Sequence, residues 1–141
     1  MKLKDSYIEE QERLLAEVLH DCDLPILNGY HSAHITLRVR YLIDQIERAQ
    51  PWHNTAVKAL ASRCVREGCF WYATHHIATL LPEKERVDEI ESILRKCMRA
   101  KKYQESKIVV EALPNNLRAR YLRKIARKEF LGRALCKLKL A

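Results

Sequence analysis

Apolar residues recur at intervals of three and four residues along most of the chain, which is the spacing of one face of an α-helix. Turn formers are scarce, with three Gly and four Pro in 141 residues, and this scarcity disfavours a strand-rich domain with many turns. The sequence therefore predicts an all-α fold of about seven to nine helices. The predicted helices cover residues 6–21, 32–50, 55–67, 70–81, 84–99, 103–113, 116–129 and 131–139.

Capping residues and breakers predict where the first helices begin and end. Ser6 and Glu9 have the spacing of a capping box, in which a hydroxyl and a carboxylate satisfy the first free amides of a helix. Ser32 stands where it can cap the second helix, and Pro51 is expected to end that helix, with the next one beginning at residues 54–55. On the first helix the residues expected to face inward are Ile8, Leu15, Val18 and Leu19.

One segment has an ambiguous pattern. Apolar residues alternate with other residues from Ile35 to Tyr41, as in a strand, whereas from Val39 to Ile46 they follow helical spacing. Because no other segment offers a partner strand, we assign the segment to a helix.

The chain contains an internal repeat with a period of about 33 residues, which is typical of stacked helix–turn–helix units. Each copy consists of two short amphipathic helices around a turn, and neither copy can bury its apolar face alone. A shift of 33 residues aligns Leu60 with Ile93, Cys64 with Cys97, Val65 with Met98, Arg66 with Arg99, Phe70 with Tyr103, Ala73 with Ser106, Ile77 with Val110 and Leu80 with Leu113.

The first copy resembles the tetratricopeptide family, because Leu60, Ala61, Cys64, Gly68, Phe70, Ala73, Ile77 and Leu80 fall at that family's spacing. The second copy departs from the family pattern at Leu94, Lys101 and Ser106. The resemblance implies a right-handed stack of antiparallel helical hairpins, an α-solenoid, in one domain over residues 1–141. The clear repeats are 54–82 and 87–114, and the atypical capping hairpins are 6–50 and 116–139.

In the tetratricopeptide family the first helices of the repeats line a groove that holds a peptide or a helix of a partner. The resemblance therefore implies a protein-binding adaptor or chaperone-like module. Basic residues in such a groove clamp carboxylates, so the expected partner is a protein or peptide with acidic and apolar character. By the resemblance, the groove residues of this chain are Lys58, Ser62, Arg66, Arg95, Met98 and Arg99.

The net charge of +8 is distributed unevenly. Residues 1–94 carry 11 Lys and Arg against 15 Asp and Glu, whereas residues 95–141 carry 15 against 3. The alternative function is therefore RNA or DNA binding through the basic C-terminal third, since cations on one face attract phosphates. The basic patch consists of Arg118, Arg120, Arg123, Lys124, Arg127 and Arg133.

No motif of the sequence indicates catalysis. The residues that come nearest to a zinc site are Cys64, Cys69, His75 and His76, but the cysteines are five residues apart and the histidines are adjacent, unlike the paired spacing of zinc ligands. A phosphate loop, a dinucleotide-binding glycine motif and a serine elbow are all missing from the sequence. The sequence therefore predicts no enzyme, no cofactor and no metal.

The first residues lack the apolar run of a signal peptide, and no stretch reaches the roughly 18 apolar residues of a membrane span. The five cysteines are scattered and include no CxxC pair, which is typical of free thiols in a reducing compartment. We therefore expect a cytoplasmic protein without a membrane span.

Overall fold

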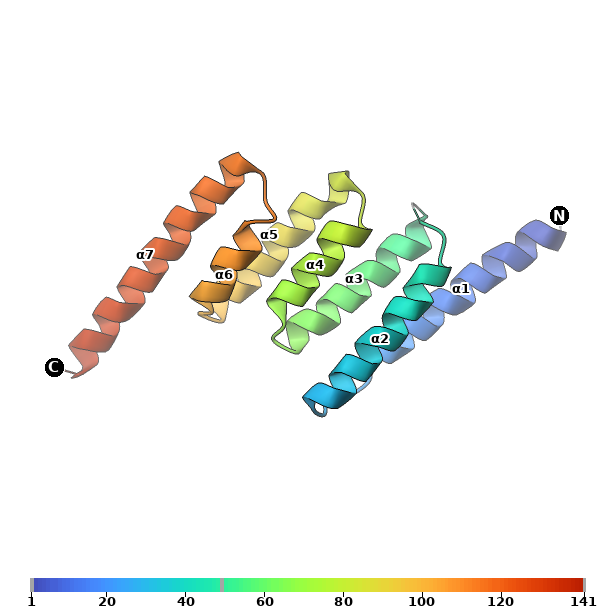
Figure 1. Ribbon diagram of the computed structural model, residues 1–141, viewed down its shortest axis with the longest axis horizontal. Helices are drawn as coiled ribbons and strands as arrows, with labels where there is room; N and C mark the ends of the chain where they lie inside the picture. Colours follow the sequence, from blue (N-terminus) through green and yellow to red (C-terminus); the bar gives the residue numbers. More distant parts are fainter. Residues whose placement is uncertain (1, 49, 141) are drawn as a thin grey trace. The chain divides into compact units, whose positions relative to one another are not determined.

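A computed structural model of the protein describes residues 2–48 and 50–140 (Figure 1). Seven helices account for the regular structure of the described residues, none of which lies in a strand. The all-α prediction and the predicted number of helices are thus confirmed. The chain divides into two compact units, residues 1–82 and 83–141. Whether the hairpins of the two units stack in one solenoid domain stays a prediction.

Unit 1 contains two helical hairpins. The first hairpin pairs α1 (Lys2–Cys22) with α2 (Gly29–Gln45), and the second pairs α3 (Pro51–Arg66) with α4 (Phe70–Leu80). α1 also packs beside α3, so α3 contacts all three other helices of the unit. The larger apolar side chains of its core are Leu14, Val18, Ile35, Val39, Ile43, Val57, Leu60, Phe70, Ile77 and Leu81.

Unit 2 contains one hairpin and a long last helix. The hairpin pairs α5 (Glu83–Arg99) with α6 (Tyr103–Val110), and α7 (Asn115–Leu140) packs against α6. Tyr121 of α7 also donates a hydrogen bond to the Glu91 carboxylate of α5 at 2.6 Å. The apolar residues buried in this unit are Ile90, Ile93, Leu94, Cys97, Met98, Val109, Val110, Leu113, Tyr121 and Ile125.

The first helix begins earlier than predicted. α1 starts at Lys2, so Ser6 lies inside the helix and the predicted capping box is wrong. The residues before Ser6 include no breaker, and the helix can extend through them. Of the residues expected to face inward, Val18 is buried but Leu19 is exposed, and Leu14 takes the place of Leu15 in the core.

The predicted limits of α2 and α3 also need correction. The cap of α2 is Asn28, whose side-chain oxygen accepts a hydrogen bond from the His31 amide at 2.9 Å, so Ser32 is not the cap. Pro51 begins α3 instead of ending the helix before it. Proline suits the first position of a helix because the amide that it lacks would have no partner there.

Two helices were predicted at the C-terminus, over 116–129 and 131–139, but α7 is continuous. The only breaker inside it is Gly132, and a single glycine costs a helix about 1 kcal/mol without ending it. α7 is therefore one 26-residue helix, and the predicted hairpin 116–139 is wrong.

The turns of the hairpins α3–α4 and α5–α6 share one local geometry. In the first, the amides of Gly68 and Cys69 donate to the carbonyls of Val65 and Cys64, at 3.0 and 2.8 Å. In the second, the amides of Lys101 and Lys102 donate to the carbonyls of Met98 and Cys97, at 2.9 and 3.2 Å. Both patterns are Schellman motifs, which need a positive φ at the residue after the cap. Gly68 has φ 79° and Lys101 has φ 59°.

Candidate binding pocket

α2 carries apolar side chains on two opposite sides. Ile35 and Val39, one turn apart, are buried, whereas Leu37 and Tyr41 are 72% and 69% exposed. Residues two positions apart point about 200° apart on a helix. The strand-like alternation from Ile35 to Tyr41 is therefore two apolar stripes, one in the core and one facing outward. Tyr30, 89% exposed, extends the outer stripe to the start of α2.

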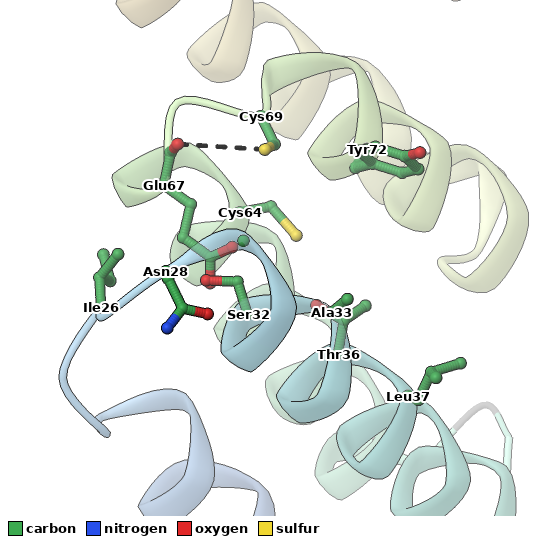
Figure 2. A pocket seen from close by; sticks show the side chains of 11 residues that line it. Ile26, Asn28, Ser32, Ala33, Thr36, Leu37, Cys64, Glu67, Cys69 and Tyr72 are labelled. Carbon is green, nitrogen blue, oxygen red and sulfur yellow. Dashed lines mark hydrogen bonds between the residues drawn. The ribbon is translucent and has the colours of Figure 1, made fainter.

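This outer side of α2 borders a pocket of about 560 Å³, shown in Figure 2. One wall is α2, Tyr72 of α4 stands across from it, and the end of α3 together with the α1–α2 connection completes the lining. Pockets of this volume that are mostly apolar are typical ligand sites. The residues that line the pocket are Ile26, Asn28, Gly29, Ser32, Ala33, Thr36, Leu37, Cys64, Glu67, Cys69 and Tyr72.

Exposed apolar side chains surround this α2–α4 pocket. Some of them line it, and the others are next to a lining residue in the sequence or one helical turn from it. We call this set the apolar rim. It comprises Ile26, Leu27, Tyr30, Leu37, Tyr41 and Tyr72, all of them exposed.

Buried Arg63 holds the α1–α2 connection that carries Ile26. The Arg63 side chain is 0% exposed and donates to the carbonyls of Cys22 and Leu24, at 3.1 and 2.5 Å. Its Nε also donates to the Glu67 carboxylate at 2.7 Å. The guanidinium therefore satisfies carbonyls at the end of α1, which have no partner within the helix, and it fixes one end of the pocket.

Several polar groups at the pocket are already engaged within the protein. The Glu67 carboxylate pairs with Arg63, and the Asn28 side chain caps α2. Burial raises the pKa of the Cys64 thiol to about 12, and the Cys69 thiol donates to the Glu67 carbonyl with an S···O distance of 3.9 Å. The reactive form of cysteine is the thiolate. Because its pKa is raised, Cys64 lines the pocket as a neutral, apolar thiol and not as a nucleophile.

The residues predicted to line a repeat groove differ in exposure. In unit 1, Ser62 is exposed, Lys58 is half-buried, and the Arg66 guanidinium donates to the Cys22 carbonyl. In unit 2, Arg95 and Arg99 are exposed. Met98, also of unit 2, is 5% exposed, so its side chain offers little surface to a peptide. The structure brings none of these residues into the α2–α4 pocket.

All six residues of the predicted basic patch lie on α7, but two of them make hydrogen bonds or an ion pair within unit 2. Arg118 donates to the carbonyls of Glu111 and Leu113, both at 3.1 Å, and thereby caps the end of α6. Arg133 pairs with Glu129 at 2.8 Å. A further patch residue, Lys124, lies over the Tyr121 ring, 5.3 Å from its centroid.

The remaining patch residues, Arg120, Arg123 and Arg127, are exposed and make no ion pair or hydrogen bond with a described residue. Their charge is therefore available to a partner.

The residues considered as zinc ligands are not placed together as a site. His76 is buried, with its Nδ1 3.0 Å from the Arg40 guanidinium, whereas His75 is exposed. Among the described residues, no three His, Cys, Asp or Glu side chains are grouped so that they could share a metal ion. No described helix is long and apolar enough to span a membrane.

The pocket residues were not predicted from the sequence. Their one signal was the alternation from Ile35 to Tyr41, which marks a helix with two apolar sides. Comparisons of this chain with protein-family models, with curated proteins and with solved structures find no match. The resemblance to the tetratricopeptide family therefore rests on the repeat alone.

Proposed function

We propose that this protein is a protein-binding module whose α2–α4 pocket and apolar rim hold an apolar segment of a partner. The observation that carries the proposal is the juxtaposition of a 560 Å³ pocket with an exposed row of tyrosine and leucine side chains. Contiguous exposed apolar surface is uncommon on monomeric proteins and marks interaction sites.

The extent of the rim favours a protein over a small molecule. Tyr30 and Tyr41 are exposed but do not line the pocket, so a ligand that filled the pocket alone would leave both of them in water. A helix or an extended segment can place one side chain in the pocket and cover the rim with its neighbours. Tyrosine is also enriched at protein interfaces, because its ring is apolar and its hydroxyl keeps a polar partner.

The pocket also defines the chemistry of the segment that it accepts. Its floor contains the neutral Cys64 thiol, and its carboxylate, Glu67, is already paired with Arg63. A charged group entering the pocket would lose its hydration without gaining an ion partner, which is costly. The favoured anchor is therefore an uncharged apolar side chain, as expected for the client of an adaptor or a chaperone.

The test is partner capture by two matched variants. Ala33 lines the pocket and Ala119 lies on α7, and both are exposed helical alanines. Ala33→Glu places a carboxylate in the pocket, where a bound partner would bury it without an ion partner. The variant is therefore expected to weaken capture from native extract by about 10-fold or more. Ala119→Glu is the control and is expected to capture the same partners as the wild type.

Photo-crosslinking localises the contact. A photoreactive residue at position 37, on the rim, should form an adduct with the captured partner, whereas one at position 119 should not. Equal capture by both glutamate variants, or adducts at position 119 alone, would show that the pocket is not the binding site. Loss of capture on reversing the charges of Arg95 and Arg99 instead would favour the groove predicted from the repeat.

A further inference from the structure

The second half of α7 is amphipathic and its apolar side is uncovered. Phe130 and Leu138 are 70% and 73% exposed, and Leu131 and Leu135 are also exposed. Together with half-buried Ala134, these four residues form the α7 stripe. At 3.6 residues per turn the stripe covers an arc of about 140°, which is a typical width for the apolar side of an amphipathic helix.

The rest of this segment is polar and mostly basic. From residue 128 to residue 139, every residue outside the stripe is Lys, Arg, Glu, Gly or Cys. Lys137 borders one edge of the stripe, and Lys128 and Lys139 border the other, each within about 40° of an apolar neighbour. Long lysine stems at such edges can lie along apolar surface while the ammonium group stays in a polar layer.

The contacts of α7 within unit 2 leave the stripe free. Tyr121 and Ile125, in the first half of the helix, are buried. Glu129 pairs with Lys107 of α6 at 3.1 Å. The side of α7 that carries Tyr121 and Ile125 lies about 130° around the helix from the centre of the stripe. The residues that anchor α7 therefore do not use the apolar side of its second half.

The unpaired cations of α7 point to the same side as the stripe. By helical spacing, Arg120, Arg123 and Arg127 fall within the arc that the stripe occupies further along the helix. One side of α7 thus presents cations in its first half and apolar side chains in its second half. α7 as a whole carries nine Lys and Arg residues and one Glu.

We infer that α7 binds the surface of an anionic membrane, with the stripe inserted between acyl chains and the cations against lipid phosphates. This combination of a basic polar side with Phe and Leu on the other side is that of a helix which lies in the membrane interface. The chemistry of the other candidates fits less well. Nucleic acid would attract the cations but would leave the stripe in water. A second copy of α7 would repel the first through like charge.

The test compares vesicle binding by the full chain and by variants that keep its charge. Vesicles of phosphatidylcholine alone are compared with vesicles that contain about 30% phosphatidylserine, since anionic lipid supplies the attraction. The wild type is expected to sediment with the anionic vesicles only. The double variant Leu131→Gln and Leu135→Gln should bind about 10-fold more weakly per leucine, because less apolar surface inserts. Glutamine preserves charge and is a good helix former.

Leu19→Gln in α1 is the matched control, since Leu19 is another exposed helical leucine and lies outside the apolar rim. It is expected to bind vesicles like the wild type. Arg123→Gln with Arg127→Gln should weaken binding about fivefold per cation. An oligonucleotide serves as the competing probe.

Three outcomes would overturn the inference. They are no binding to anionic vesicles, equal vesicle binding by the wild type and the double leucine variant, and tighter binding to the oligonucleotide than to vesicles at the same salt. The last result would assign the cations to nucleic acid. None of the three bears on the α2–α4 pocket, which lies in unit 1.

Discussion

The hairpin α3–α4 of unit 1 and the hairpin α5–α6 of unit 2 have the same turn but different polar groups. Both end their first helix in a Schellman motif, and the carbonyls of Cys64 and Cys97 accept equivalent hydrogen bonds. The aligned residues Ala73 and Ser106 are both 0% exposed. The serine hydroxyl is accommodated because it donates to the Lys102 carbonyl at 2.8 Å. The repeat thus preserves backbone geometry and close helix packing even where residue types change.

The buried polar groups, by contrast, are not repeated. Arg63 is fully buried, but the residue 33 positions later is exposed Lys96. His76 is buried beside Arg40, and the corresponding residue is the buried Val109. These two side chains depend on what packs against the hairpin, since buried polar groups need partners and theirs lie at the end of α1 and on α2. The comparison teaches that the turn is a property of the hairpin, whereas buried polar residues are a property of its surroundings.

The largest effect is expected at Arg63. Arg63→Met removes the hydrogen bonds from Arg63 to the carbonyls of Cys22 and Leu24 and leaves the largely buried Glu67 carboxylate unpaired. The free energy of unfolding should therefore fall by about 3–5 kcal/mol. Lys96→Met, the equivalent change in the other hairpin, should stay within about 0.5 kcal/mol because the side chain is exposed. Urea denaturation of both variants measures the difference. Similar losses would mean that Arg63 has no special role.

A smaller, pH-dependent effect is expected from His76. Burial, the Arg40 cation and His75 lower the pKa of His76 from 6.5 to about 4, so the folded protein holds His76 neutral above about pH 4. Between these two pH values the unfolded chain binds more protons, and stability therefore falls as the pH falls from about 6.5 to about 4. The contribution of His76 to this loss is about 3 kcal/mol.

His76→Val, which introduces the residue found at position 109, should remove this part of the pH dependence. Arg40→Met should remove less of it, because burial, the largest cause, remains. Thermal unfolding of the wild type and both variants at several pH values measures how much of the pH dependence of stability each variant removes. Parallel profiles for the wild type and His76→Val would contradict it.

The smallest effects, opposite in sign, are expected at the two turns. Gly68→Ala places a Cβ at a positive φ and should destabilise the protein by about 1 kcal/mol. Lys101→Gly relieves the same constraint in the other hairpin and should stabilise the protein by about 0.5–1 kcal/mol. Denaturant midpoints of the two variants on either side of the wild-type value would support the shared turn geometry. Shifts in the same direction would contradict it.

Helical periodicity and scarce turn formers predicted the all-α fold correctly because they report on local backbone preference. The limits of helices were less predictable. Pro51 begins a helix rather than ending one, and Ser6 lies within a helix. A proline is compatible with both roles, and a hydroxyl caps a helix only if the chain enters the helix there. These ambiguities are resolved by packing, which the local sequence does not contain.

The candidate sites, like the helices, were predictable from the sequence only in part. The cations of α7 were evident from the sequence, because charge needs no fold to be counted. The sequence did not show which of these cations are engaged within the protein. In the structure Arg118 caps α6, Arg133 is paired and Arg123 is unpaired. The α2–α4 pocket could not be predicted at all, since Leu37 and Tyr72 belong to different hairpins. Their proximity requires α2 and α4 to flank α3.

The sequence by itself determined the all-α class and the 33-residue repeat. Helical periodicity depends on residues within a few positions of one another, and the repeat is found by aligning the sequence with itself. Only the tertiary structure decided which apolar side of α2 is buried and which remains exposed. Both sides of that helix are apolar, so periodicity alone could not distinguish them. The difference arises because α1 and α3 cover one side, whereas the other borders the pocket.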